Sequence, residues 1–278
     1  MRPIGMMDSG VGGLTVLKAT QKLLPNERYI YVGDTARMPY GPRSSEEVVE
    51  FSLEIAHFLV DHYQIKLLAI ACNTATACAL PALQAELDIP IVGVIDAGAR
   101  AAIAATKNKR VGVIATEGTI SSGSYQGDLK AGDPDLEIFA EAQPDFVQYV
   151  EGARYNDEAL QFEIDRHLAN LAKDDVDTLV LGCTHFPLLA PLIQKSMGAN
   201  VTLVDPGWQT ARDIQAILKE QHLAQPTKKL GENIYYTTGS PDTFRVIASD
   251  WMASDKQLDI RHLVIKEDHG KGYLEEAK

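Results

Sequence analysis

The stretch Leu179–Pro187, which reads LVLGCTHFP, decides how this chain folds. Its apolar start is typical of a buried strand, and the short polar residues after Cys183 indicate that a helix begins there. The stretch Leu67–Thr76, which reads LLAIACNTAT, has the same plan and places Cys72 at the same joint. The two cysteines lie 111 positions apart. A plan repeated at this distance indicates a duplication.

Two further pairs of segments test the duplication. Val111–Thr116 resembles Ile4–Asp8 at an offset of 108 positions, and Asn200–Asp205 resembles Ile91–Asp96 at an offset of 109. Because the three offsets agree within three residues, we predict two homologous halves, each presenting one cysteine at an equivalent strand end. Any function proposed for this chain must therefore give a role to both cysteines.

Short apolar runs alternate with amphipathic segments along most of the chain, which is the rhythm of parallel sheets covered by helices. We expect an α/β fold of two pseudo-symmetric domains with mainly parallel sheets flanked by helices, and an active site in the cleft between them. Residues 98–207 should form one domain, and residues 1–97 with 208–278 the other, discontinuous one. The pattern also predicts helices near Ile120–Lys130 and over Asp157–Ala172, and a mobile polar tail from about His269.

The composition limits the classes of function. A formal net charge of −12 argues against nucleic-acid binding, because neutralising phosphates requires a basic face. The three cysteines form no CxxC pair and make no disulfide framework. No apolar run is long enough to span a bilayer, and Asp8 comes too early for a signal-peptide core. We therefore expect a cytoplasmic protein with no membrane partner.

A glycine-rich loop follows the first predicted strand. Gly10 and Gly12 begin a dinucleotide-binding fingerprint, but Thr15 stands where the third glycine belongs, and the P-loop pattern is also incomplete. The exposed N–H groups of such a loop can still hold a carboxylate at a helix N-terminus. Asp8 and Ser9 lie at the carboxyl end of the strand, where open α/β sheets bind ligands. An equally good interpretation of Asp8 alone is a helix cap.

Each cysteine taken singly is more often a small apolar core residue than a reactive group. Their equivalence favours chemistry. At a strand-to-helix joint, the helix dipole and free N–H groups stabilise a thiolate, so we expect the pKa of both Cys72 and Cys183 to lie below the usual value of about 8.5. Cys78 differs, because it falls about 1.7 turns into the helix after Cys72, where core packing is the better interpretation.

His185 has several possible roles. It could make a structural hydrogen bond, or bind a metal with Cys183, but no His, Cys or carboxylate cluster supplies further ligands at a suitable spacing, so we expect no metal. Cys–His nucleophilic catalysis is possible but leaves Cys72 unexplained. Proton transfer explains both thiols. Two acid/base groups that face each other across one carbon can remove a proton from one face and return another to the opposite face.

Four motifs together resemble the glutamate racemases, and the resemblance covers nearly the whole chain to about residue 265. Aspartate racemases of the same superfamily are similar but carry Glu two residues after the second cysteine, so His185 favours glutamate. The motifs are Asp8–Thr15, Gly33–Gly41, Ala71–Ala75 and Leu181–Leu188.

The resemblance implies a cofactor-independent interconversion of L- and D-glutamate that supplies D-glutamate for peptidoglycan synthesis. It implies that Cys72 deprotonates D-glutamate and Cys183 L-glutamate, with Asp8 assisting the first thiol and His185 the second. Glu151 matches an acidic residue of the family near the site. The implied substrate contacts are Asp8, Ser9, Tyr40, Gly41, Asn73, Thr74, Thr116, Thr119, Thr184 and His185.

The physical chemistry of the reaction adds its own requirements. An α-proton is very weakly acidic, so a thiolate removes it only in a dry site with donors preorganised on the carboxylate. Two neighbouring thiols cannot both ionise cheaply, so we expect one thiol and one thiolate. We also expect a homodimer that needs no activator. A glutamate-binding regulatory module without turnover is the alternative from another class, and a pure binder has no use for symmetric acid/base groups.

Overall fold

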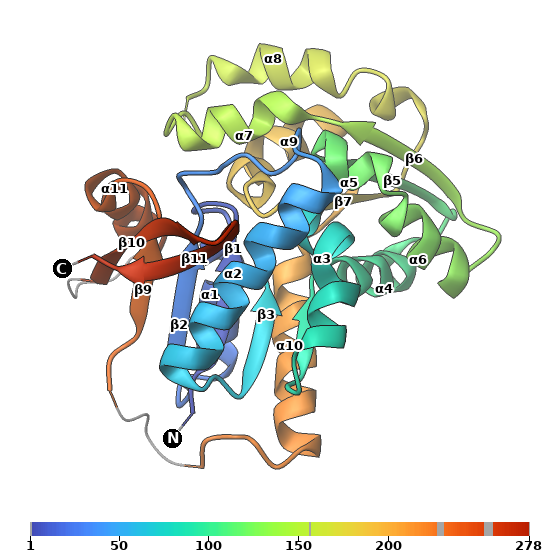
Figure 1. The fold of residues 1–278 in the computed structure, drawn as a ribbon. Coiled ribbons are helices and arrows are strands. Elements are labelled where there is room, and N and C mark those ends of the chain that lie inside the picture. The colour runs from blue at the N-terminus through green and yellow to red at the C-terminus, as the bar shows by residue number, and fades with distance from the viewer. Residues whose placement is uncertain (1, 156, 227–230, 253–257, 278) are drawn as a thin grey trace.

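The computed structural model describes residues 2–155, 157–226, 231–252 and 258–277. It contains a seven-stranded sheet of order β11-β10-β9-β2-β1-β3-β4 and a four-stranded sheet of order β6-β5-β7-β8. Every neighbouring pair of strands is parallel except the antiparallel pair β10–β11. The prediction of an α/β fold with mainly parallel sheets flanked by helices is confirmed. Figure 1 shows the two sheets as separate bodies, with helices around each.

We name the two bodies the first and second lobes. The strands of the first lobe are β1 (Ile4–Asp8), β2 (Tyr29–Gly33), β3 (Leu67–Ile70), β4 (Ile91–Gly93), β9 (Ile234–Thr237), β10 (Asp259–Asp268) and β11 (Lys271–Glu276). Its helices are α1 (Leu14–Leu23), α2 (Ser45–Tyr63), α3 (Asn73–Glu86), α10 (Pro206–Glu220) and α11 (Pro241–Met252).

The strands of the second lobe are β5 (Arg110–Ala115), β6 (Glu137–Ala142), β7 (Thr178–Gly182) and β8 (Thr202–Val204). Its α-helices are α4 (Ile95–Ala105), α5 (Glu117–Ser121), α6 (Ser124–Gly132), α7 (Pro144–Glu151), α8 (Leu160–His167) and α9 (Ala190–Met197), and its 3₁₀ helices are η1 (Leu171–Lys173) and η2 (Phe186–Leu189).

Strand pairing decides which residues can meet between the lobes. In the first lobe β1 and β3 are parallel neighbours, so Asp8 and Cys72 lie at adjacent carboxyl ends. In the second lobe β5 and β7 are parallel neighbours with Ala115 opposite Gly182, so Thr116 and Cys183 follow at adjacent carboxyl ends. The duplication therefore places the two cysteines on corresponding strand ends of the two sheets, as the repeat predicted.

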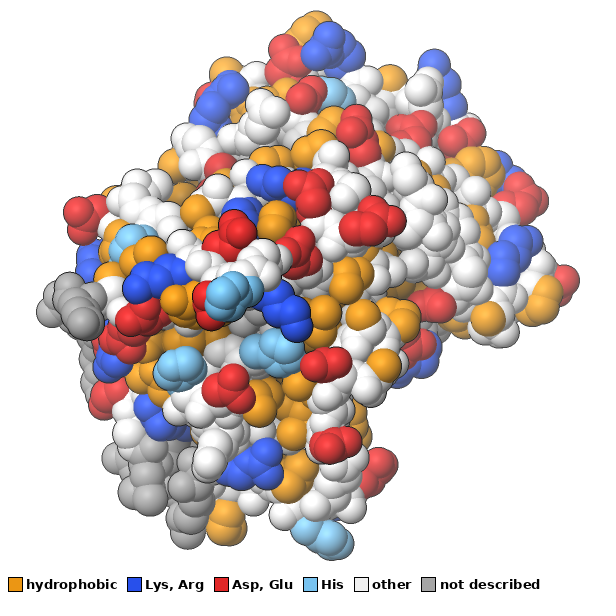
Figure 2. Space-filling model, in the orientation of Figure 1, with side chains coloured by type: hydrophobic (Ala, Val, Ile, Leu, Met, Phe, Trp, Pro, Cys, Tyr) orange, Lys and Arg blue, Asp and Glu red, His pale blue; other side chains and the backbone are white. Residues whose placement is uncertain are grey.

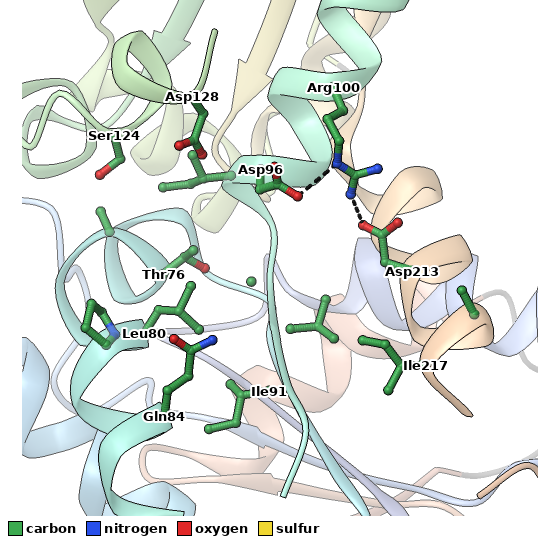
Figure 3. Close-up of a pocket in the computed structure, with 16 residues that line it drawn as sticks. Thr76, Leu80, Gln84, Ile91, Asp96, Arg100, Ser124, Asp128, Asp213 and Ile217 are labelled. Atoms are coloured by element: carbon green, nitrogen blue, oxygen red, sulfur yellow. Dashed lines mark hydrogen bonds and ion pairs between the residues drawn. The ribbon is translucent and has the colours of Figure 1, made fainter. Parts of the chain in front are cut away.

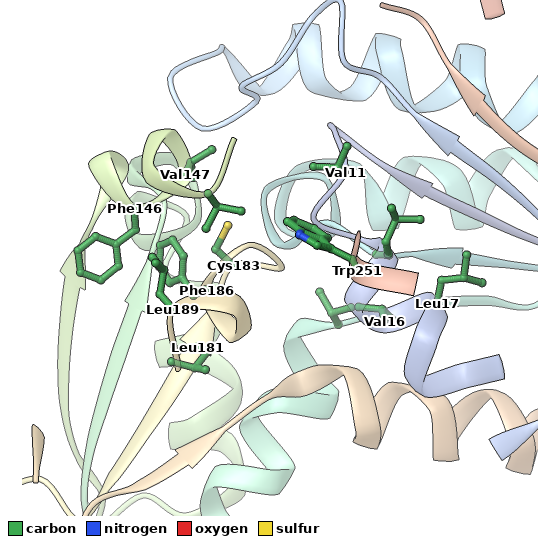
Figure 4. Packing of buried hydrophobic residues seen from close by; sticks show 14 of the residues in the cluster. Val11, Val16, Leu17, Phe146, Val147, Leu181, Cys183, Phe186, Leu189 and Trp251 are labelled. Atoms are coloured by element: carbon green, nitrogen blue, oxygen red, sulfur yellow. The ribbon is translucent and has the colours of Figure 1, made fainter. Parts of the chain in front are cut away.

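One hydrophobic cluster spans both lobes and helps to hold them together. Figure 4 shows Val11 and Trp251 of the first lobe on one side, and Phe146 and Phe186 of the second lobe on the other, with Cys183 between these groups. All of these side chains are buried. Removing such apolar area from water stabilises the fold by about 25 cal/mol per Å². The packing also surrounds Cys183 with apolar surface.

Two predicted helices differ from the pattern, one by a break and one by its length. The helix expected at Ile120–Lys130 is divided into α5 and α6, because Gly123 adopts a φ of 69°, which a right-handed helix cannot contain. The helix expected at Asp157–Ala172 is reduced to α8, followed by the short η1. The amphipathic pattern correctly predicted helices in both segments, but the local backbone conformation determined where each helix begins and ends.

The prediction of a mobile tail from His269 was wrong. The tail forms β11, which pairs antiparallel with β10 and buries Leu274. His269 and Gly270 form the two-residue connection and have φ values of 48° and 78°. Positive φ at both positions is what a tight hairpin turn needs for its twist to match that of its strands. Among the described residues no helix is long and apolar enough to cross a membrane.

The surface carries mixed charges. Acidic and basic side chains lie interspersed over the face shown in Figure 2. A cavity of about 610 Å³ lies between α3, α4 and α10 and is separate from the two cysteines. At its rim Arg100 contacts Asp96 at 2.9 Å and Asp213 at 2.5 Å, as the dashed lines in Figure 3 show. These are exposed ion pairs, with 46% of the Arg100 side chain accessible to solvent.

Candidate active site

Both cysteines line one small cavity between the lobes. Its free volume is about 20 Å³, which is room for little more than one water molecule. The first lobe contributes the side of the cavity that contains Cys72, and the second lobe contributes the side that contains Cys183. The cavity is lined by Ser9, Pro39, Tyr40, Gly41, Cys72, Asn73, Thr74, Thr116, Val147, Cys183, Thr184 and His185.

Cys72 is the N-cap of α3, as its place before the helix predicted. Its Sγ accepts a hydrogen bond from the Ala75 N–H at 3.5 Å and donates to Ser9 Oγ at 3.8 Å. The expected lowering of the pKa of Cys72 was wrong. Burial, with a further contribution from the charge of Asp8, raises the pKa of Cys72 well above its usual value. Loss of water around the sulfur outweighs the donors at the helix N-terminus, so Cys72 is held as a neutral thiol.

Asp8 lies beside Cys72 and holds the N–H groups before α1. Its Oδ2 accepts hydrogen bonds from Gly13 N–H at 2.8 Å and Gly10 N–H at 3.2 Å, so it holds the glycine-rich loop. Its Oδ1 is buried and has no hydrogen-bond partner among the described residues. Burial raises the pKa of Asp8, although the charge of His185 and the hydrogen bonds from Gly13 and Gly10 act against the shift. A carboxyl group of raised pKa beside a buried thiol can exchange a proton with it.

Cys183 lies in different surroundings from Cys72. The segment after it forms the 3₁₀ helix η2, and the α-helix α9 begins only at Ala190. A helix does follow Cys183, as predicted, but it begins as a 3₁₀ helix three residues later, and Cys183 is not its N-cap. The donors at an α-helix N-terminus that Cys72 has are therefore lacking at Cys183. A side chain supplies the positive charge instead, because Sγ of Cys183 lies 3.6 Å from Nδ1 of His185.

His185 connects Cys183 to a carboxylate. Its Nε2 lies 2.6 Å from Oε1 of Glu151, and only 3% of the His185 side chain is exposed. Burial acts against a charge on the ring, but hydrogen bonds with Cys183 and Glu151 outweigh it and raise the pKa of His185 well above its usual value. His185 is therefore an imidazolium, the counter-charge that a thiolate at Cys183 needs. Glu151 does not line the cavity, and its contact with a cavity residue is the one with His185.

Three threonines meet across the cleft. Oγ1 of Thr74, in the first lobe, lies 2.9 Å from Oγ1 of Thr116 and 3.2 Å from that of Thr119, both in the second lobe. Thr119 is fully buried behind the cavity wall, whereas Thr74 and Thr116 line the cavity. Gly41 approaches Thr116 so closely that an added Cβ would lie 2.9 Å from the threonine Cβ. Of the predicted substrate contacts, all but Asp8 and Thr119 line the cavity, and they come from both lobes.

Asp34 is a site-shaping residue that the sequence analysis did not identify. It is fully buried. Its Oδ2 accepts hydrogen bonds from the Tyr40 hydroxyl at 2.5 Å and from Arg37 at 2.7 Å. Its Oδ1 accepts one from Thr238 at 2.7 Å. These bonds fix the loop that carries Tyr40 to the cavity. The proximity of Asp34, Arg37 and Tyr40 in the sequence is the signal that could have revealed it.

The ion pairs of Arg37 provide a test of how this loop is held. Arg37 lies between the buried carboxylates of Asp34 and Glu54, at 2.7 and 2.5 Å. Replacing it with methionine should lower the free energy of unfolding by about 3–5 kcal/mol, because two buried carboxylates lose their partner. Arg100→Met is the matched control at the exposed pairs and should cost less than about 1 kcal/mol. Equal costs in urea denaturation would contradict this account.

Comparisons with known proteins agree with this geometry. A profile of the Asp/Glu/hydantoin racemase family matches residues 4–214. The glutamate racemase of Lactiplantibacillus plantarum is 51% identical over 251 residues, which cover 90% of this chain and 91% of that protein. The glutamate racemase of Enterococcus faecalis is 50% identical over 250 residues, which cover 90% of this chain and 91% of that protein.

Solved structures are equally similar. The crystal structure of glutamate racemase isoform RacE1 from Bacillus anthracis gives a TM-score of 0.89 at 40% identity and covers 94% of this chain and 97% of that one. Glutamate racemase from Francisella tularensis in complex with D-glutamate gives a TM-score of 0.86 at 33% identity, with coverage of 94% and 97%. On these matches, the chain belongs to the Asp/Glu racemase family and, within it, to the glutamate racemases.

Proposed function

We propose that this protein racemises glutamate without a cofactor, by moving the α-proton between Cys72 and Cys183. The observation that carries the proposal is that two thiols from equivalent strand ends line one small cavity. Each thiol has its own acid/base partner, Asp8 for Cys72 and His185 for Cys183. This is the arrangement that proton removal from one face of a carbon and delivery to the other requires.

The surroundings of the thiols assign their resting states. Cys72, held neutral by burial and by Asp8, is ready to give a proton. Cys183 lies 3.6 Å from the imidazolium of His185, and this positive charge is suited to support Cys183 as the base. This state accepts L-glutamate, since Cys183 is the thiol assigned to the L-enantiomer. Removal of the α-proton by Cys183 and delivery by Cys72 leave the opposite arrangement, which accepts D-glutamate.

The cavity supplies the rest of the catalysis through neutral donors. Ser9, Asn73 and the threonines line it, and they can hold the α-carboxylate while negative charge develops on it. Because the free volume holds about one water molecule, glutamate cannot enter the cavity as it stands. The lobes must therefore separate to admit substrate and then close to exclude water. We propose that residues 1–97 with 208–278, and residues 98–207, move as the two domains.

The comparisons support glutamate as substrate. The Francisella tularensis structure holds D-glutamate, and the glutamate racemase structure from Escherichia coli holds L-glutamate and an activator. From the family we propose that the protein supplies D-glutamate for peptidoglycan synthesis in the cytoplasm, and that it is a homodimer. The alternative, a glutamate-binding module without turnover, has no need for the two acid/base pairs.

The experiment is to follow the circular dichroism of L-glutamate and of D-glutamate with the purified protein and no added cofactor. Both signals should decay to zero, because the two enantiomers are equally stable and the equilibrium mixture is racemic. L-Aspartate serves as the comparison substrate and should react far more slowly. Binding of glutamate without decay of either signal would support the binding module instead.

A further inference from the structure

Tyr125 contacts both cysteine-bearing segments although it lies on neither. It belongs to α6 of the second lobe and is fully buried. An added Cβ at Gly182, the residue before Cys183, would lie 3.0 Å from the Tyr125 ring, and one at Gly98 would lie 2.9 Å from its hydroxyl. The hydroxyl donates to Oδ1 of Asn73, the residue after Cys72, at 2.7 Å. Small residues thus make room for a ring that reaches the other lobe.

The hydrogen bond determines which way the Asn73 amide faces. Asn73 lines the cavity and is 4% exposed. The Tyr125 hydroxyl occupies Oδ1, which leaves the two N–H groups of Nδ2 to face a ligand. If the amide were flipped, the buried phenol proton would lose the acceptor that it has among these residues. An unsatisfied buried donor costs about 1–3 kcal/mol, so the observed orientation is the favoured one.

The charge state of Tyr125 suits this role. Burial, with smaller contributions from the charges of Cys183, Asp205 and Asp128, raises the pKa of Tyr125 well above its usual value. The phenol therefore keeps its proton, and the hydroxyl remains a donor through the working pH range. Because the hydroxyl donates to Oδ1 of Asn73, the N–H groups of the same amide face the cavity. Such N–H groups attract a carboxylate and repel an ammonium. Since Asn73 follows Cys72 directly, the carboxylate within its reach is the one next to the reacting carbon.

We propose that Tyr125 is a positioning residue of the racemisation, which holds the Asn73 amide with its N–H groups toward the α-carboxylate of glutamate. The inference rests on the proposed function. Negative charge on that carboxylate grows as the α-proton leaves, so the two N–H groups stabilise the transition state more than the bound substrate. Losing their alignment should therefore lower kcat more than it raises KM.

The first test compares two buried tyrosines whose hydroxyls donate to different acceptors. Tyr125→Phe keeps the ring that packs against Gly182 and removes the bond to Asn73. Tyr29→Phe is the matched control, because Tyr29 is buried and donates to the Leu24 carbonyl at 2.9 Å, outside the cavity. Tyr125→Phe should lower kcat roughly tenfold in both directions and change KM by less than about threefold. Tyr29→Phe should lose similar thermal stability and keep the kcat of the wild type.

A double-mutant cycle then tests whether Tyr125 acts through Asn73. In an Asn73→Ala background, Tyr125→Phe should change kcat no further, because there is no amide left to align. Independent, multiplying losses would overturn the inference, and so would a wild-type kcat for Tyr125→Phe. If Tyr29→Phe lost as much activity as Tyr125→Phe, both losses would reflect reduced stability, and this result would also overturn the inference.

A third variant needs no change at Tyr125. Asn73→Asp keeps an acceptor for the phenol but replaces the N–H groups with an oxygen, so it should lower kcat more than Asn73→Ala does. Equal or higher activity of Asn73→Asp would overturn the inference even if Tyr125→Phe failed to fold. Failure of the wild type to racemise glutamate would instead contradict the proposed function. Normal racemisation by all Tyr125 and Asn73 variants would contradict only the inference.

Discussion

Replacing either Cys72 or Cys183 with alanine should lower racemisation by roughly 10³-fold or more, because one face of the α-carbon then lacks its base or its acid. The equilibrium constant between the enantiomers is unity, so kcat/KM must fall equally in both directions for each variant. Rates alone therefore cannot say which thiol faces which enantiomer. The fate of the α-proton can.

Deuterated water distinguishes the two thiols. With the wild type, early product from either enantiomer should carry deuterium at the α-carbon while unreacted substrate keeps its protium, because the delivering thiol has exchanged with solvent. Each single variant keeps one base and should exchange the α-proton of one enantiomer only, slowly and without inversion. Cys183→Ala should exchange D-glutamate through Cys72, and Cys72→Ala should exchange L-glutamate through Cys183. Proton NMR of the α-position measures both.

Cys78→Ala is the matched control for these variants. Cys78 is partly buried against the core, and its Sγ lies 3.7 Å from Ser45 Oγ, away from the cavity. Its replacement should cost at most about 1 kcal/mol of stability and leave turnover intact. Substantial protium in early product of the wild type, or near-normal racemisation by Cys72→Ala, would rule out the two-thiol mechanism.

Replacing Glu151 with glutamine should move the upper pH limit of kcat/KM downward by about one unit or more. Burial opposes charge on His185, and the contacts with Cys183 and Glu151 are what raise the pKa of His185. Without the carboxylate this pKa falls toward its ordinary value near 6.5. The imidazolium that supports a thiolate at Cys183 is then lost at a lower pH. The variant should be least impaired in acid and most impaired in alkali.

The measurement is kcat/KM for both enantiomers as a function of pH. Asp145→Asn is the matched control, since Asp145 lies on the same helix and pairs with another histidine, His167, at 3.3 Å outside the cavity. It should leave the pH profile unchanged. His185→Gln should lower kcat/KM by roughly 10²-fold or more and lose the alkaline limit that depends on the ring. A Glu151→Gln profile that superimposes on the wild type would show that Glu151 does not maintain the charge of His185.

The sequence by itself determined the fold class and identified the candidate catalytic residues that local motifs contain. Burial periodicity identified the parallel strands, and the repeat identified Cys72 and Cys183 as equivalent, because both depend on local spacing. The capping box of Ser44 and Glu47 at the start of α2 also depends only on local spacing. The resemblance to a family added the roles of Asp8, His185 and Glu151, which remain proposals.

The tertiary structure alone decided how the two thiols differ. The pKa of Cys72 rises because burial and Asp8 act together, and these come from packing that no single segment encodes. The pair of His185 and Glu151 joins residues 34 positions apart, and the bond from Tyr125 to Asn73 joins residues 52 apart. Local patterns state which face of an element is buried. The pKa of a thiol depends on all the charges and dipoles around it, and only the folded chain brings these neighbours together.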